Sequence, residues 1–415
     1  MKQNKLTFIT CCWLIFLNPL VFGILSEFTH FDRNNMIDSR AGGMGGAYIA
    51  LSDTLVGGYY NPAGLAYIDY KRTTESNNIF RNTSLKYKSV SNDFTYETTS
   101  ESTSPPFIGL FQNYGGFNLL FSVIIPKSET YNKDYNKTTS IDNTNITYFE
   151  NLDGHNNHYL IGPSIAMMFS DNFSAGLSVF YSYESRNYIQ NIYTYPTDAK
   201  NALQIWDNTY NEENTHEVLA IFGIQWMPSL NLSFGGKINL PIQLSASGKE
   251  QSTKATLDHI NNQYSSTITS STYDLKTLGF QSNYPTLGIG GAYIMSSSTL
   301  FAFDVNFMVE GKTSTTFPTR SILNFALGVE HYLLTFAPIR FGIYTNNSYY
   351  PENINGDHLN GYGITGSIGY ESGANSLSLG FDFQSATGTT TLNGSVTDNL
   401  SYNGLTILLS GSSSI

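Results

Sequence analysis

Several stretches of this chain alternate between apolar and polar residues with a period of two. Such alternation is typical of β-strands that place one face in apolar surroundings and the other in polar surroundings. Segments 231–244, 299–310 and 376–384 follow the pattern. In segment 299–310 the odd positions from Phe301 to Val309 are apolar, whereas the even positions include Asp304 and Asn306. The pattern predicts an all-β protein.

The order of the connections indicates a closed barrel. Strand-like runs follow one another along the chain, and the gaps between them are alternately short and long. The short gaps, such as 114–116, are compact turns, and the long gaps 127–156, 188–215 and 250–279 are rich in Asn, Thr, Ser and Tyr. Short turns on one side and long loops on the other are typical of outer-membrane barrels, and lipid does not tolerate an open sheet edge. We therefore expect a transmembrane antiparallel β-barrel of about 14 strands. The expected strands are 71–82, 106–113, 117–126, 157–170, 174–187, 216–228, 231–249, 280–295, 299–312, 323–336, 339–350, 361–371, 376–388 and 400–411.

The first residues are typical of an export signal. A positive start at Lys2 and Lys5 is followed by an almost wholly apolar stretch, and we expect residues 1–23 to be removed as a signal peptide. Both cysteines, Cys11 and Cys12, lie within it, so the mature chain is expected to contain no thiol. The apolar stretch is shorter than the roughly 20 residues of a spanning helix. We expect the mature protein in the bacterial outer membrane, crossing it many times as strands.

A glycine-dense, nearly uncharged segment lies between the signal and the strand series, from Ser39 to Asp69. It contains a run from Arg40 to Ala47, RAGGMGGA, and a later NPAGL block that starts at Asn61. Such sequences also form ordinary turns, since Gly adopts positive φ and Pro presets a turn. With the strands that follow it, the segment resembles the N-terminal signature of the FadL/TodX family of outer-membrane transporters for hydrophobic compounds, which includes PorV-like relatives.

The resemblance implies a small plug, or hatch, inside the barrel lumen, with residues 24–70 as plug and 71–415 as barrel. It also implies passive passage of long-chain fatty acids or other hydrophobic small molecules through an apolar channel that the plug gates. In the family, lateral release depends on a distorted strand near the N-terminus, but residues 117–125 contain no Gly or Pro that would reveal one. The residues that match the plug motif are Arg40, Gly42, Gly43, Gly45, Gly46, Asn61, Pro62, Ala63 and Gly64.

Strand parity places several polar side chains on the lumen side of the barrel. They are Lys237, Asp304, Asn306, Glu310, Glu330 and Asp382. Lys237 could bind a fatty-acid carboxylate, or it could form an ion pair with Asp304 or Asp382 across the lumen. Charge in a lumen commonly tunes selectivity or braces a plug. Aromatic residues near strand ends are expected in interfacial girdles. They are Tyr181, Tyr183, Trp226, Tyr293, Tyr344 and Tyr370.

Composition narrows the function classes. The chain carries 21 basic against 32 acidic residues, a formal net charge of −11, and so lacks the basic footprint that nucleic acid requires. No nucleophile elbow, P-loop or HExxH motif occurs, so we expect no enzyme and no cofactor. His155 and His158 have a spacing that could hold a metal with further ligands, and simple solvation in a polar loop is the alternative. A barrel hydrolase with side chains converging from separate strands stays open.

Other non-enzymatic classes stay open as well. A PorV-like barrel would bind partner proteins or cargo through its extracellular loops without passing lipid, and a surface adhesin would need the loops alone. The expected partners are a fatty acid-like ligand and outer-membrane lipid. Apolar residues in the long gaps could form an outer capture groove or pack the loops together. They are Ile141, Ile146, Phe149, Leu203, Ile205 and Trp206. The chain lacks a terminal aromatic residue, which implies that the last strand ends at Leu409 or that the strand count is off by one.

Overall fold

The computed structural model describes residues 36–68, 72–88, 95–141, 144–196, 203–258, 263–274, 283–310, 319–349, 356–372, 375–392 and 396–414. The expected signal peptide and the first part of the expected plug segment lie outside these residues. The described chain begins with three short helical turns and continues as β-strands. Among the described residues, no helix has the length and the apolar character needed to cross a bilayer.

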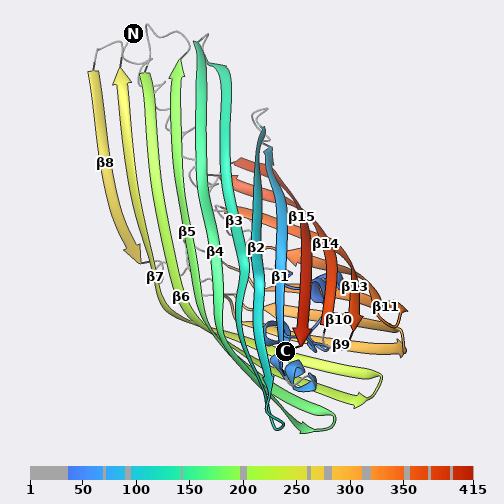
Figure 1. Ribbon diagram of the computed structural model, residues 1–415. Coiled ribbons are helices and arrows are strands. Elements are labelled where there is room, and N and C mark those ends of the chain that lie inside the picture. Colours follow the sequence, from blue (N-terminus) through green and yellow to red (C-terminus); the bar gives the residue numbers. More distant parts are fainter. Residues whose placement is uncertain are drawn as a thin grey trace.

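Fourteen strands form a closed antiparallel barrel (Figure 1). Strands next to each other in sequence pair with each other, except that β8 does not pair with β9. Instead β7 pairs with β9, and β15 pairs with β1 to close the barrel. The fourteen-stranded barrel expected from the sequence is therefore confirmed. The strands are β1 (Arg72–Lys88), β2 (Thr95–Asn113), β3 (Asn118–Ile141), β4 (Thr144–Ser170), β5 (Phe173–Pro196), β6 (Leu203–Ser229), β7 (Leu232–Asp258), β8 (Gln263–Asp274), β9 (Thr286–Ser296), β10 (Thr299–Met308), β11 (Ile322–Leu334), β12 (Ala337–Asn347), β13 (Gly356–Ser372), β14 (Asn375–Leu392) and β15 (Val396–Ser414).

The long gaps that the sequence indicates as loops are largely strand, which corrects the expected boundaries. β3 and β4 pair with each other through most of the expected loop 127–156, and β8, a fifteenth strand, pairs with the outer part of β7. Polar residues on both faces hide the period of two, although Thr and Tyr favour strands. The last strand also continues past Leu409, since Ser414 pairs with Thr73, and the barrel count stays at fourteen.

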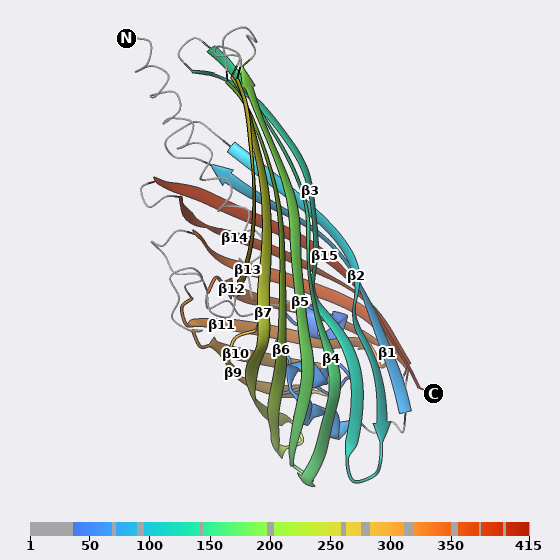
Figure 2. The ribbon, with the colours of Figure 1, turned by 90° about the vertical axis from the view of Figure 1, so that its left-hand side faces the viewer.

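These extensions stand on one side of the molecule and rise above β9 to β13 (Figures 1 and 2). We call them the tall wall. The tall wall consists of residues 127–141 of β3, 144–159 of β4, 183–196 of β5, 203–217 of β6 and 245–258 of β7, together with β8. His155 and His158 lie in its β4 strand and not in a loop, and their odd spacing puts them on opposite faces. The two rings therefore cannot share one metal ion.

The outer face of the barrel carries an apolar belt, which we call the lipid belt. On β10 the side chains of Phe301, Phe303 and Phe307 are exposed outside, while Ala302 and Asp304 are buried inside. β7 and β14 alternate in the same way, as the sequence pattern predicts. A closed barrel with such a belt is built to span a membrane. Other members of the lipid belt include Ile108, Phe121, Ile161, Ile165, Val179, Phe222, Ile224, Ile238, Ile242, Leu379, Phe381 and Leu405.

The expected aromatic girdle is found in part. Trp226, Tyr293 and Tyr370 are exposed near the ends of their strands, next to the short turns. Tyr344, in contrast, is 3% exposed, and its hydroxyl donates to the carboxylate of Asp382 at 2.9 Å. Its assignment to the girdle is wrong because the even positions of β12 face the lumen.

Residues 36–68 fold inside the barrel, close to its short turns (Figure 2). They form α2 (Ser39–Gly43), α3 (Gly57–Tyr60) and the 3-10 helix η1 (Pro62–Tyr67). The carboxylate of Asp38 caps α2 by accepting hydrogen bonds from the first backbone amides of the helix. α2 packs against β12 to β15, whereas η1 packs against β4 to β6. This plug and the wall share one apolar core, which includes Met44, Leu65, Phe107 and Phe180.

Candidate functional site: the plug and the lumen wall

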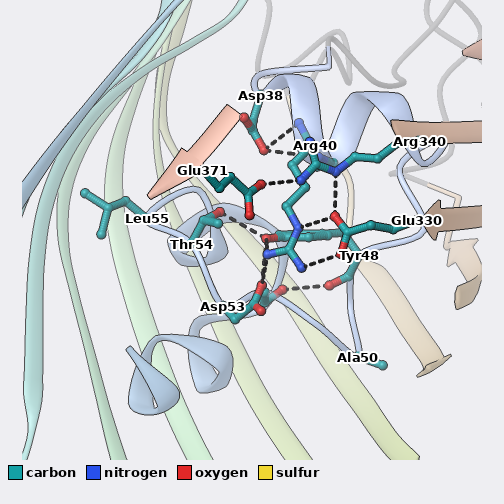
Figure 3. Close-up of polar contacts among 12 residues, drawn as sticks. Asp38, Arg40, Tyr48, Ala50, Asp53, Thr54, Leu55, Glu330, Arg340 and Glu371 are labelled. Carbon is teal, nitrogen blue, oxygen red and sulfur yellow. Dashed lines mark hydrogen bonds and ion pairs between the residues drawn. The ribbon is translucent and has the colours of Figure 1, made fainter. Parts of the chain in front are cut away.

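Arg40 in α2 carries the charged contact between plug and wall (Figure 3). Its Nε and Nη2 donate to the two carboxylate oxygens of Glu330 on β11, at 2.9 and 3.0 Å, and its Nη1 donates to Asp53 at 2.7 Å. Arg340 on β12 binds Glu330 from the other side and also binds Glu371. Burial by itself lowers the pKa of Arg40, but the carboxylates of Asp53 and Glu330 raise that pKa well above its ordinary value. The plug is thus tied to the wall by a permanent, bidentate ion pair.

Wall side chains also hold the backbone of the plug. One carboxylate oxygen of Asp304 on β10 accepts from the backbone N–H of Tyr48 at 2.8 Å and of Ile49 at 3.0 Å. The hydroxyl of Thr365 on β13 accepts from the backbone N–H of Gly45 at 2.9 Å. Because these groups are buried, each bond replaces one that water would otherwise make. Polar residues of β10 to β13 therefore hold the plug in place by hydrogen bonds to its backbone.

Asn61 fixes the second half of the plug. Its side-chain amide donates to the backbone carbonyl of Ile49 at 2.7 Å and to that of Ile224 on β6 at 3.0 Å. Its amide oxygen accepts from the backbone N–H of Ala63 and so caps η1, with Pro62 in the first helical position. Asn61 is fully buried. A single side chain thus joins two parts of the plug and the wall.

Glycines let the plug approach the wall closely. Gly45 has φ of +68° and Gly46 has φ of +79°, which L side chains rarely adopt. A Cβ on Gly64 would lie 2.4 Å from the carbonyl oxygen of Ser52. The wall also has glycines that face the plug. They were not predicted from the sequence, although a glycine inside a strand commonly marks a close backbone approach. At these positions a Cβ would collide with plug atoms: Gly176, Gly223, Gly235, Gly290, Gly328 and Gly342.

The lumen residues expected from parity are not gathered into one site. Glu330 and Asp304 bind the plug, and Asp382 accepts from the hydroxyl of Tyr344. Lys237 and Asn306 lie on either side of Gly288, beside the Ile49 side chain. Glu310 is exposed beyond the end of β10. The apolar residues of the expected capture groove also separate, because Ile205 is buried while Trp206 is 56% exposed.

An apolar strip crosses the inner face of β2 to β6, between polar residues such as Ser178 on the plug side and Glu184 on the tall-wall side. Phe107, Ile124, Leu160, Phe180 and Leu219 come from five successive strands, β2 to β6, and all are buried on the inner face. Their level lies just beyond the serine and glycine contacts of the plug. The strip is a surface suited to hydrophobic molecules, and it lies next to the hydrogen bonds by which Ser174, Ser178 and Ile224 hold the plug.

The pairing of β2 with β3 is interrupted next to the apolar strip. The two strands pair at Phe107 with Ile124 and again at Ser100 with Tyr131, but not in between. At the same level the register of β2 with β1 and the register of β3 with β4 both shift. Pro105 and Pro106 in β2 and Pro126 in β3 explain the irregularity, because proline donates no backbone hydrogen bond. These prolines lie outside residues 117–125, in which no Gly or Pro signals a distortion. On the outer surface beside them, a hollow of about 490 Å³ is lined by Leu110 and the lipid-belt residues Ile108 and Phe121, with Glu75 also in its lining.

No family model and no curated protein matches this sequence. Solved structures do match. A Pseudomonas aeruginosa FadL homologue has a TM-score of 0.61 at 12% identity over 93% of this chain and 100% of that chain. The Pseudomonas putida toluene transporter TodX has a TM-score of 0.64 at 12% identity over 90% and 97%. The Ralstonia pickettii toluene transporter TbuX has a TM-score of 0.58 at 11% identity over 91% and 98%. The chain therefore has the fold of the FadL and TodX channels, a plugged fourteen-stranded barrel of the outer-membrane type.

Proposed function

We propose that this protein is a passive outer-membrane transporter of hydrophobic small molecules and that its plug gates an apolar path. The observation that carries the proposal is the apolar strip in the lumen, from Phe107 to Leu219, which lies beside the irregular pairing of β2 and β3. A hydrophobic molecule is stabilised along such a surface by about 25 cal/mol for each Å² removed from water. The structural neighbours include toluene transporters and a monoaromatic hydrocarbon channel, which supports this class of ligand.

The path that fits these features enters from the side of the tall wall and follows β2 to β6. It leaves sideways where Pro105, Pro106 and Pro126 interrupt the ladder between β2 and β3. The plug closes this path from below, because α3 and η1 pack against the same strands. Movement of the plug away from β4 to β6 would widen the path, and we propose that α2 must release its contacts with β12 to β15 for the plug to move.

Long-chain fatty acids and neutral hydrocarbons are the substrates that we propose to test first. The apolar strip accepts either of them, since dispersion and burial do not distinguish an acyl chain from an aromatic ring. Lys237 lies beside Ile49 of the plug and not on the apolar strip. We therefore propose that recognition depends on the hydrocarbon part and not on a carboxylate bound by Lys237.

A disulfide between plug and wall tests gating. The hydroxyls of Ser39 in α2 and Ser378 on β14 are in hydrogen-bond contact, and the only natural cysteines, Cys11 and Cys12, lie in the expected signal peptide. Oxidised Ser39→Cys/Ser378→Cys should take up less labelled fatty acid and less labelled toluene, and a reductant should restore uptake. The matched control is Ser376→Cys/Ser412→Cys, because these hydroxyls, 2.9 Å apart, join the neighbouring wall strands β14 and β15.

A second candidate function is a PorV-like barrel that binds partner proteins, and the dense bonding of the plug favours it. Arg40, Asn61 and Gly45 each bond the wall, as expected for a plug that stays in place. The same experiment separates the two functions. Uptake that falls on oxidation of the plug disulfide and returns on reduction supports transport. An empty barrel that takes up neither compound in any state contradicts transport and favours the partner-binding barrel.

A further inference from the structure

The tall wall continues the lipid-facing surface far beyond the lipid belt. On β4 the belt residues extend up to Ile161, and residues 144–159 stand above them. Sixteen residues of strand span about 50 Å at roughly 3.3 Å per residue. The outer face of these strands therefore reaches well past the hydrocarbon of the membrane, into whatever surrounds the outer leaflet.

Two rows of aromatic rings cross the outer face of the tall wall. The lower row is Tyr159, Tyr183 and His216, which pair across β4, β5 and β6, with ring centroids 6.3 and 5.0 Å apart. The upper row pairs Phe149, Tyr193 and Trp206 on the same three strands. Ten residues of β5 separate the rows, or about 33 Å. Ile189 is exposed between the rows, and the other outward residues of β5 between them, Ser185, Asn187 and Asn191, are polar. Rings on such a mixed face are suited to stacking against molecules with both apolar and polar faces.

Directly below the upper row lies a ladder of amides. Asn151 donates to Asp134 at 2.8 Å, Asn191 donates to Asn151 at 3.3 Å, and Asn208 donates to Asn191 at 2.5 Å. The four residues are partners in the registers of β3 to β6. Each asparagine amide has two donors and two acceptor lone pairs, so each keeps the capacity for a further hydrogen bond. The ladder is a fixed row of donors and acceptors beside the exposed ring of Trp206.

The charge of the outer face of the tall wall indicates which class of molecule binds there. Its described residues include the acidic Asp134, Asp153 and Glu212, with Lys249 as the basic residue paired with Glu212 in the register. Phosphate recognition calls for clustered Arg or Lys, and this face offers carboxylates in their place. Stacking rings and amide hydrogen bonds fit uncharged sugars, whose rings have an apolar C–H face and a rim of hydroxyl groups.

We propose that the outer face of the tall wall binds the oligosaccharide of the glycolipids that surround the barrel in the outer leaflet. The same strands carry the lipid belt below and the aromatic rows above, so the molecules that touch the belt with their acyl chains present their sugars to this face. Contact along two ring rows and the amide ladder would hold the tall wall upright within the sugar layer. The proposal rests on the placement in the outer membrane and not on transport, so a failed uptake experiment would leave it intact.

The fluorescence of Trp206 tests the proposal in the full-length mature protein in detergent. The mature chain is expected to contain Trp206 and Trp226, because Trp13 lies in the expected signal peptide. In a Trp226→Phe variant, oligosaccharide released by mild acid from the lipopolysaccharide of the native host should change the emission of Trp206 in a saturable way. Asn191→Ala/Asn208→Ala in that background should weaken binding about tenfold, since it removes hydrogen bonds without touching the rings.

Matched measurements distinguish binding of uncharged sugar from recognition of phosphate and from contact with a second copy of this chain. Calorimetry on Trp206→Ala should show weakened binding, whereas Trp226→Phe should bind as the unchanged protein does. Enzymatic removal of phosphate from the oligosaccharide should leave the affinity within about twofold. Loss of binding on phosphate removal, equal affinity in the asparagine variant, or no emission change at millimolar oligosaccharide would overturn the proposal. So would a dimer in sedimentation that Trp206→Asp dissolves, because the face would then be a contact between copies.

Discussion

Replacement of Glu330 by Gln should loosen the plug more than any other single change of one carboxylate in its network. Glu330 is 3% exposed and lies between two guanidinium groups, those of Arg40 and Arg340. Removal of one partner from a buried ion pair costs about 3 to 5 kcal/mol. Arg40 keeps Asp53 as a second partner, so we take the lower end, about 3 kcal/mol. At 1.4 kcal/mol for each factor of ten, the opened plug should become roughly 100-fold more populated.

Hydrogen exchange followed by mass spectrometry measures this population. Peptides covering residues 39–53 should exchange roughly 100-fold faster in Glu330→Gln, while peptides from the barrel wall should not change. Glu371→Gln is the matched control, because Glu371 binds Arg340 and Tyr332 but is 29% exposed on its side chain and does not touch the plug. Equal exchange in the two variants, or a slower plug in Glu330→Gln, would refute the view that this ion pair holds the plug.

Two further predictions test the packing of the wall on both of its sides. Gly342→Ala would place a Cβ 2.1 Å from the backbone N of Gly45. The same exchange measurement should therefore show faster exchange in the displaced plug. Gly116→Ala is the control, because its Cβ would meet open space, and it should behave as the unchanged protein. Phe303→Lys on the lipid belt should destabilise the barrel in bilayers by about 2 to 4 kcal/mol in urea titrations, and Tyr114→Lys, at the exposed turn, by less than about 1 kcal/mol. A wild-type exchange rate in Gly342→Ala, or equal costs for the two lysines, would contradict the assigned faces.

The sequence pattern was most successful where one face of a strand meets lipid. Phe301 and Phe303 on β10 and Leu379 on β14 all point outward as their parity predicts. A strand between lipid and a polar lumen must alternate, so the period of two survives in the sequence. The strands of the tall wall were predicted as loops for the opposite reason. These strands carry polar residues mixed with apolar ones on both faces, and a sequence without an apolar period looks like a loop.

The plug shows a similar division. Its turns could be recognised from Gly45, Asn61 and Pro62, because positive φ and helix capping are requirements of the local backbone. Its partners could not be recognised. Arg40 meets Glu330, which is 290 residues away in sequence, and the wall glycine Gly342 meets the plug only after β12 has its register.

The sequence by itself therefore determined the all-β class, the barrel of fourteen strands, the outward faces and the local turns of the plug. Each of these follows from residues that are neighbours along the chain. Only the tertiary structure decided that β8 joins the tall wall, that Tyr344 faces the lumen, and that residues of five strands meet in one apolar strip. The physical reason is that pairing register and barrel closure bring together residues hundreds of positions apart. The local periodicity of the sequence does not indicate which of these residues meet.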